Sequence, residues 1–219
     1  MRLALYSFWR STSTWRVRIG LALKGVAFEY RAVNLQEGVQ FQPEHRRRNP
    51  MSQIPVLEVE EDGLLRHLSQ SMAILEWLDE RFPAPPLLPA DALGRARVRA
   101  LAEHVNAGMQ PYQNLAARKF LHAARKGLED EWTGHFLRVG TAALEEAVRD
   151  GAGRFCHGDQ PTLADLYLVP QLAGSRRFGV PLDGCPTLLR IEAACAELPA
   201  FRAAAPERQP DAPPAAVSR

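Results

Sequence analysis

Four small hydroxyl residues, Ser11-Thr12-Ser13-Thr14, stand where the apolar segment "RLALYSF" gives way to a helical pattern that begins at Trp15. One Ser or Thr at a helix N-terminus accepts a hydrogen bond from an unpaired backbone N–H and acts as a cap. Four in a row leave further hydroxyls at the positive end of the helix dipole, where an anion is stabilised. The cluster therefore indicates either a plain helix cap or an anion-binding turn.

The anion that suits this turn best is a thiolate. A phosphate loop requires more glycine than this stretch contains, and Gly20 lies inside the helix. The pKa of a thiol falls at helix N-termini and near arginine, and the thiolate is the reactive form. In a redox thioredoxin-like protein a Cys-x-x-Cys motif occupies this junction, but here Cys156, Cys185 and Cys195 all lie in the second half of the chain. A bound thiol substrate would supply the thiolate, and plain capping remains the alternative.

Two further stretches favour the thiol interpretation. In "NPMSQIPVL", Pro55 is expected to open a strand after a cis peptide bond, which turns the N–H and C=O of Ile54 toward a peptide-like ligand. In "SQSMAIL", Gln70 and Ser71 stand at another helix N-terminus, which suits a ligand carboxylate, although Ser71 could be a simple cap. Receptors for a thiolate, a peptide backbone and a carboxylate together describe a glutathione site.

The elements that must position these residues are predicted from hydrophobic periodicity and turn signals. The first 82 residues read as strand, helix, strand, short helix, two strands joined by an Asp-Gly hairpin turn, and helix, which is the order of a thioredoxin-like fold. The segments are "RLALYSF", a helix from Trp15 to Lys24-Gly25, "FEYRAVN", residues 39–47, "IPVLEVEEDGLLRHL" and "SQSMAILEWLDERF".

A second domain follows a proline-rich linker. "PAPPLLPAD" at residues 83–91 cannot form a helix or a central strand, so we predict a thioredoxin-like domain over residues 1–82 and an all-helical domain over residues 92–209. Within it, "PTLADLYLVPQLAG" opens with a Thr162/Asp165 capping box and is almost wholly apolar, which predicts a central helix. Residues 210–219 are expected to form a flexible tail. The fold class is therefore α/β plus all-α.

Composition excludes several classes of protein. The chain has 219 residues, a net charge of +2 and 46% hydrophobic residues, so no global field marks a nucleic-acid binder. The run Arg46–Arg48 is read as a solvated helix face. No apolar stretch reaches the length of a membrane span or a signal-peptide core, and we expect a cytoplasmic protein. The three cysteines indicate reduced thiols, and the scattered histidines indicate no metal site.

The sequence resembles the glutathione transferase family, and within it the zeta class, whose members include maleylacetoacetate and maleylpyruvate isomerases. The segment "STSTWRVRIGLALKG" is similar to the Ser-Ser-Cys-x-Trp-Arg-Val-Arg-Ile motif of that class. The similarity continues through "NPMSQIPVL", "QSMAILEWLDERFP", "MQPYQNL", "TLADLYLVPQ", "RRFGV" and "RQPDAP". The resemblance implies the glutathione transferase fold, glutathione as cofactor, a homodimer, and a role in tyrosine and phenylalanine degradation.

The resemblance also implies roles for individual residues. Ser11 matches the serine that activates glutathione, and Ser13 stands where the class has its cysteine, so both are candidate catalytic residues. Arg10 and Arg177 are candidates for holding the carboxylates of an acidic substrate. The matching glutathione contacts are Ser11, Thr12, Ser13, Thr14, Trp15, Arg16, Gln40, Gln53, Ile54, Gln70 and Ser71 in the first domain, and Gln110 and Asn114 in the helical domain.

The implied activity is the cis–trans isomerisation of a maleyl-type dicarboxylic keto acid. A thiolate that adds to the double bond allows rotation, and its elimination restores glutathione. We expect maleylacetoacetate as the substrate, because Leu115 and Ala116 follow Asn114 where maleylpyruvate isomerases tend to carry arginines. Arg118 could partly replace those arginines, so maleylpyruvate remains an alternative, as does glutathione transfer to α-halo acids. A non-catalytic binding protein is a further alternative that the retained site residues oppose.

Overall fold

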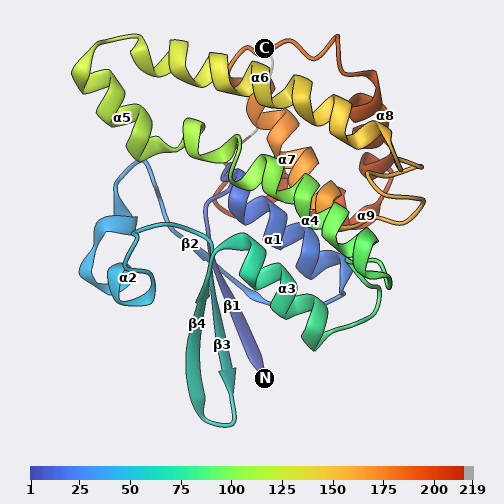
Figure 1. Ribbon diagram of the computed structural model, residues 1–219. Helices are drawn as coiled ribbons and strands as arrows, with labels where there is room; N and C mark the ends of the chain where they lie inside the picture. Colours follow the sequence, from blue (N-terminus) through green and yellow to red (C-terminus); the bar gives the residue numbers. More distant parts are fainter. Residues whose placement is uncertain (215–219) are drawn as a thin grey trace. The chain divides into compact units, whose positions relative to one another are not determined.

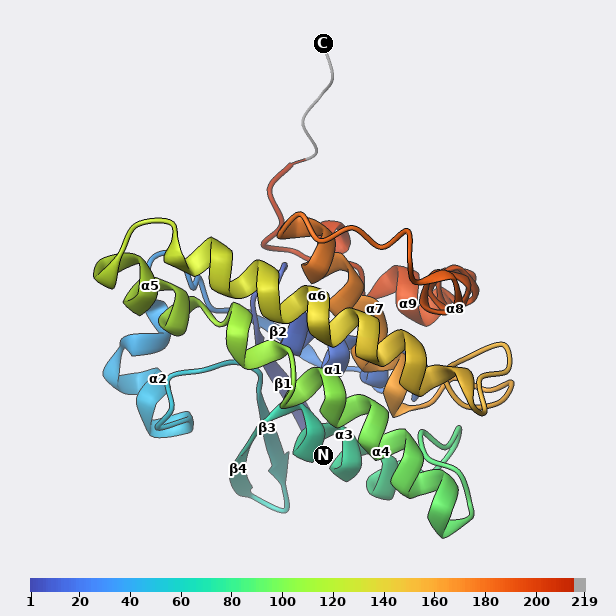
Figure 2. The same ribbon diagram turned by 45° about the horizontal axis from the view of Figure 1, so that its top comes forward.

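A computed structural model describes residues 1–214 of the chain, which divide into two compact units (Figures 1 and 2). The first unit comprises Met1–Pro85 together with residues 198–214, and the second comprises Pro86–Glu197. Within residues 1–214, no helix is both long enough and apolar enough to cross a membrane.

The first unit is a four-stranded mixed sheet with helices on both of its faces. Strand order is β2-β1-β3-β4; β1 is parallel to β2 and antiparallel to β3, and β3 is antiparallel to β4. Helices α1 and α3 lie together on one face, and α2 lies beside the other (Figures 1 and 2). Its elements are β1 Arg2–Ser7, α1 Thr12–Leu23, β2 Glu29–Ala32, η1 Val39–Phe41, α2 Pro43–Arg48, β3 Val56–Glu61, β4 Leu64–Ser69, α3 Ser71–Arg81, α9 Pro199–Ala203 and η3 Pro206–Arg208.

The second unit is helical and is organised around α7. This helix packs against α4, α6 and α8, and its apolar residues, including Leu166 and Leu172, are almost completely buried. Burying each such leucine contributes about 1.5–3 kcal/mol. Asp165 accepts hydrogen bonds from the backbone N–H groups of Thr162 and Cys156 and so caps the helix start. The elements are α4 Ala92–Asn106, η2 Gln110–Gln113, α5 Leu115–Ala124, α6 Leu128–Arg149, α7 Leu163–Arg177 and α8 Pro186–Ala196.

The predicted fold class and the predicted element order of residues 1–82 are confirmed, with one division inside a predicted element. The helix expected at residues 39–47 is split into η1 and α2 at Gln42, because Pro43 has no N–H to continue the first helix but is well suited to begin the next. Asp62 and Gly63 both have positive φ, as the tight hairpin turn requires.

The C-terminal part of the chain differs from the predicted domain division. The prediction placed residues 92–209 in the helical domain, whereas the structure places residues 198–214 with the first unit, because α9 packs against α1. Of the predicted tail, residues 210–214 are described and include Asp211, which accepts hydrogen bonds from Trp9 and Tyr30. Residues 215–219 lie outside the described part of the chain.

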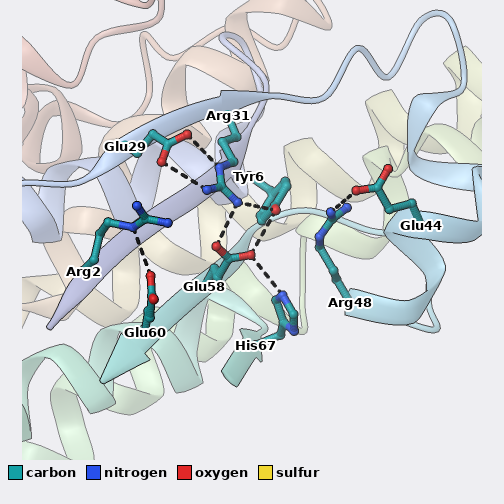
Figure 3. Close-up of polar contacts among 9 residues, drawn as sticks. All are labelled: Arg2, Tyr6, Glu29, Arg31, Glu44, Arg48, Glu58, Glu60 and His67. Atoms are coloured by element: carbon teal, nitrogen blue, oxygen red, sulfur yellow. Dashed lines mark hydrogen bonds and ion pairs between the residues drawn. The ribbon is translucent and has the colours of Figure 1, made fainter. Parts of the chain in front are cut away.

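Strand register separates an apolar sheet face from a polar one. Leu5 of β1 is paired with Leu57 of β3, and both are fully buried on the apolar face. The adjacent position, Tyr6, points to the other face, where Arg31, Glu58 and His67 from the neighbouring strands meet it (Figure 3). This alternation follows from the two-residue period of a strand.

Glu58 is the acceptor at the centre of the polar face. Its carboxylate accepts hydrogen bonds from the Tyr6 hydroxyl at 3.1 Å and from Arg31 at 2.8 Å, and it lies 3.2 Å from His67 Nε2 (Figure 3). Burial raises the pKa of the Glu58 carboxyl, but the hydrogen bonds from Tyr6 and His67 and the charge of Arg31 outweigh it and hold the pKa below its ordinary value. The ionised carboxylate therefore stabilises the sheet.

Replacing this carboxylate should destabilise the first unit. We expect Glu58→Gln to lower the free energy of unfolding by about 1.5–3 kcal/mol, because hydrogen bonds to a charged group are lost at a buried position. The matched control is Glu60→Gln on the same strand, whose ion pair with Arg2 is exposed (Figure 3) and should be worth less than about 1 kcal/mol. Urea titrations would measure both changes.

The pH dependence of the same difference provides a second check. A depressed folded-state pKa contributes stability at neutral pH that is lost as the pH falls through that pKa. The difference in the free energy of unfolding between the wild-type chain and Glu58→Gln should therefore become smaller in acid. A gap that stays constant between pH 7 and pH 3 would show that the charge of Glu58 does not carry the effect.

Candidate functional site

The hydroxyl cluster forms the N-terminus of α1, and Ser11 is its N-cap. The Ser11 side chain accepts a hydrogen bond from the backbone N–H of Thr14 at 3.3 Å. A hydroxyl that accepts in this way still has its own hydrogen to donate. The first turn of α1 contains no acidic residue that would offset the positive end of the helix dipole. Capping and anion binding, the two alternatives for this cluster, are therefore compatible in Ser11.

The four hydroxyls are not equivalent. Thr14 is fully buried, and its hydroxyl donates to the backbone carbonyls of Phe8 and Ser11 at 3.2 and 3.1 Å. Thr12 is also buried, whereas Ser11 and Ser13 are half-buried. Thr14 thus stabilises the turn, and the hydroxyls with solvent access are those of the two serines.

A buried guanidinium links this helix start to the start of α3. Arg16 has no exposed surface, and its Nη1 donates to Ser71 Oγ at 3.2 Å. Gln70, the residue before α3, has φ of 71°, and the first turn of α3 also contains no acidic residue. The contact between Arg16 and Ser71 therefore links α1 to the N-terminus of α3. Helix N-termini of this kind stabilise anions.

The loop before β3 is anchored from α2. The carbonyl oxygen of Gln53 accepts from Asn49 Nδ2 at 2.9 Å and lies 3.0 Å from His45 Nε2. The next peptide bond, Ile54–Pro55, is cis, which confirms the prediction at Pro55. These contacts fix the backbone at the point where the sequence predicted a peptide-binding edge.

Several buried polar atoms in the first unit have no hydrogen-bond partner within the described residues. Among them are Gln40 Oε1 and Trp15 Nε1, both from predicted glutathione contacts. Gln40 is 4% exposed, and its amide nitrogen makes only a long contact of 3.5 Å with the carbonyl of Leu35. Buried polar atoms normally have hydrogen-bond partners, so these two atoms fit a site in which a polar ligand supplies the missing partners.

Arg10 stands at the exposed side of the hydroxyl turn. Its guanidinium carbon lies 5.7 Å from the centre of the Trp9 ring and 5.9 Å from that of Phe8. Its side chain is exposed, so its charge is available near Ser11. This position is compatible with the predicted contact to a substrate carboxylate.

The remaining predicted site residues, Gln110, Asn114 and Arg177, lie in the second unit. Gln110 Oε1 accepts from Gln113 Nε2 at 3.0 Å, and the same nitrogen donates to the buried Gln171 at 2.7 Å. Asn114 caps α5, since its Oδ1 accepts from the N–H of Ala116 at 2.9 Å. Buried amides thus orient Gln110 from the centre of the helical unit.

The two adjacent arginines at the end of α7 have different surroundings. Arg176 pairs with Glu192 of α8 at 2.6 Å, and this hydrogen-bonded carboxylate raises the pKa of Arg176. Arg177 is exposed, with its guanidinium carbon 4.9 Å from the centre of the Phe178 ring. The ion pair with Glu192 therefore gives Arg176 a structural role at the end of α7.

Arg118 is occupied by structural contacts. Its guanidinium donates to the carbonyl of Glu129, the hydroxyl of Thr133 and the carboxylate of Asp130, each at 2.8 Å. Its guanidinium carbon also lies 4.7 Å from the centre of the Phe178 ring. These contacts tie α5 to α6 and leave Arg118 poorly suited to replace the arginines that this chain lacks after Asn114.

Sequence reasoning missed two residues that hold the hydroxyl turn. Arg18 is buried, and it donates hydrogen bonds to the carbonyls of Phe8 and Trp9. Asp211 accepts from the N–H of Trp9 at 3.0 Å. An arginine in an otherwise apolar helix signals a buried structural guanidinium, but no local signal connects Asp211 to a turn 202 residues away.

Comparisons with known proteins agree with the fold. The family described as "Glutathione S-transferase, N-terminal domain" matches residues 1–80. The crystal structure of a maleylacetoacetate isomerase from Anaeromyxobacter dehalogenans with glutathione bound is 64% identical, with a TM-score of 0.91 and coverage of 97% of this chain and 98% of that one.

Two curated relatives are equally similar to this chain. The maleylacetoacetate isomerase of Pseudomonas aeruginosa is 44% identical over 96% of this chain and 99% of its own length. The maleylpyruvate isomerase of a Ralstonia species is also 44% identical, over 94% of this chain and 98% of its own length.

Proposed function

Because this chain belongs to the zeta class of glutathione transferases, which includes the maleylacetoacetate isomerases, we propose that it is a glutathione-dependent cis–trans isomerase of a maleyl-type keto acid. Maleylacetoacetate is the proposed substrate and fumarylacetoacetate the product. The observation that carries the proposal is Ser11, a hydroxyl with a hydrogen to donate at an uncompensated helix N-terminus.

The first unit offers the groups that glutathione requires. The α1 N-terminus and Ser11 suit its thiolate, the backbone at Ile54 suits its peptide portion, and the α3 N-terminus at Ser71 suits a carboxylate. The orphaned Gln40 Oε1 would accept from an N–H group of the ligand. When bound, glutathione supplies the nucleophilic thiolate that adds to the cis double bond and leaves again after rotation.

The residues of this chain would stabilise charge rather than form covalent bonds. Ser11 donates a hydrogen bond to the thiolate, and the dipole of α1 adds to this stabilisation at the same point. Arginine side chains neutralise the acidic ends of the substrate, for which the exposed Arg10 and Arg177 are the candidates. The hydrogen bond from Arg16 to Ser71 connects α1 to the start of α3 and thus helps to hold the two helix N-termini in place.

Maleylpyruvate is the second candidate substrate, since a maleylpyruvate isomerase is as similar to this chain as a maleylacetoacetate isomerase. The occupied guanidinium of Arg118 and the apolar Leu115 favour maleylacetoacetate. The deciding experiment assays both acids side by side and measures free glutathione. Stoichiometric consumption of glutathione would contradict isomerisation and indicate a conjugating transferase.

Ser11→Ala should reduce turnover more than it weakens glutathione binding. The lost hydrogen bond to a charged group is worth about 1.5–3 kcal/mol, which corresponds to a fall in kcat of roughly one to two decades. Steady-state kinetics and calorimetric binding of glutathione would separate the two effects. Ser13→Ala, measured in parallel, identifies the activating hydroxyl. A wild-type rate in Ser11→Ala with a loss in Ser13→Ala would move the role to Ser13.

Arg177→Ala should lower kcat/KM for the acidic substrate and leave glutathione affinity unchanged. A guanidinium binds a carboxylate through two hydrogen bonds, so Arg177→Lys should restore only part of the loss. The matched control is Arg176→Ala, which breaks the ion pair with Glu192 and should leave kcat/KM unchanged. Equal losses for glutathione and for the acid in Arg177→Ala would assign Arg177 to the fold.

The chain is also proposed to act as a cytoplasmic homodimer, on the basis of the family. Light scattering at micromolar concentration should give about twice the chain mass of 24.4 kDa. A mass near that of one chain would contradict the dimer.

A further inference from the structure

The peptide groups of Trp9 are held on both sides by charged side chains. Its N–H donates to Asp211 Oδ2 at 3.0 Å, and its carbonyl accepts from Arg18 Nη2 at 2.9 Å. Trp9 lies on the turn between β1 and α1, two residues before Ser11. The backbone that leads into the Ser11 hydroxyl is thus fixed between an anion and a cation.

The anion belongs to the far end of the chain. Asp211 lies just after η3, and its second carboxylate oxygen, Oδ1, accepts from the Tyr30 hydroxyl at 2.6 Å. Burial and this hydrogen bond raise the pKa of Tyr30 above its ordinary range, so the hydroxyl remains protonated and able to donate. Both oxygens of the carboxylate are therefore committed, one to β2 and one to the turn.

The cation connects the same turn to α9. Arg18 Nε donates to the carbonyl of Ala204 at 3.1 Å, and its Nη1 lies within 3.3 Å of the Phe8 carbonyl and of the Thr14 hydroxyl. Burial lowers the pKa of Arg18 to about 10, partly countered by Tyr30 and Asp211, so the guanidinium stays charged at neutral pH. The C-terminal segment, residues 198–214, thus contacts the turn in two ways, through Asp211 and through the carbonyl of Ala204.

These contacts bear on Ser11 because the turn is short. The N–H of Ser11 donates to the Phe8 carbonyl at 2.9 Å, and that carbonyl also accepts from Arg18 and Thr14. Only Trp9 and Arg10 lie between them. A shift of the Trp9 peptide would therefore move Ser11, and small displacements of a reacting group reduce rates steeply.

We propose that Asp211 is a positioning residue for the Ser11 hydroxyl, and that the C-terminal segment thereby sets the place where that hydroxyl meets the thiolate of glutathione. The inference rests on the proposed role of Ser11. It assigns a functional purpose to the "RQPDAP" segment, which resembles the family in sequence but which carried no role in the site.

The test uses the full chain and the thiol of bound glutathione. The amide of Asp211→Asn retains one acceptor oxygen and cannot satisfy both Trp9 and Tyr30. Ultraviolet absorbance of the thiolate, followed against pH in the enzyme–glutathione complex, should show its pKa rising by about one unit. We expect kcat/KM to fall by about ten- to a hundredfold. Tyr30→Phe frees Asp211 of one partner without removing its bond to Trp9, and should give a smaller change in the same direction.

Asp62→Asn is the matched control, because it makes the same charge change at the exposed β3–β4 turn and should alter neither readout. The decisive variant combines Asp211→Asn with Ser11→Ala. If Asp211 acts through the Ser11 hydroxyl, adding Asp211→Asn to Ser11→Ala should cost no more than about twofold. The full loss in that background would overturn the proposal.

Three other results would also overturn the positioning role, and a fourth would contradict only the proposed function. An Asp211→Asn chain that melts earlier but keeps the wild-type thiol pKa and kcat would show a purely structural role; if that chain does not fold, an unchanged thiol pKa in Tyr30→Phe overturns the proposal in the same way. A wild-type complex whose thiol pKa equals that of free glutathione would remove the premise. A lowered, Asp211-dependent thiol pKa without isomerase activity would contradict the proposed function alone and support the positioning role.

Discussion

The buried guanidinium of Arg18 is the interaction on which the first unit depends most. It reaches Ser7 at the end of β1, the turn at Phe8 and Trp9, and the carbonyl of Ala204 after α9. A buried charge is costly unless its hydrogen bonds are satisfied, so these carbonyls must converge on it for the unit to fold. The same convergence closes the turn that presents Ser11, and stability and site geometry therefore share one cause.

Local patterns were sufficient to predict the order of the elements in residues 1–82. Strand alternation, the Asp62-Gly63 turn and the hydroxyl cap at Ser11 each depend on residues close in sequence, and each is present in the structure. The prediction that the helical domain extends to residue 209 was wrong, because α9 packs against α1 of the first unit. This packing includes a hydrogen bond from Arg18 to the carbonyl of Ala204, 186 residues away in the sequence. Hydrophobic periodicity describes neighbouring residues and cannot predict a contact over that separation.

The predicted site residues differ in how the structure holds them. Arg16, a predicted glutathione contact, is fully buried, and its Nη1 donates to Ser71 Oγ. A sequence motif shows which residues recur around a ligand, but it does not distinguish those that face the ligand from those that hold the facing residues in place. The pattern of burial and hydrogen bonding shows a supporting role for Arg16 and Thr14, which both stay predicted glutathione contacts.

The cysteines of the chain show why the thiolate must come from a ligand. Cys156, Cys185 and Cys195 are all buried, and burial raises the pKa of each thiol, so all three are neutral at physiological pH. They lie in the second unit, whereas the helix start that favours a thiolate lies in the first. With Ser13 in the place of the family cysteine, the turn has no thiol of its own to stabilise. A helix start that favours a thiolate but has no cysteine of its own suits an external thiol, which is what the proposed role of Ser11 requires.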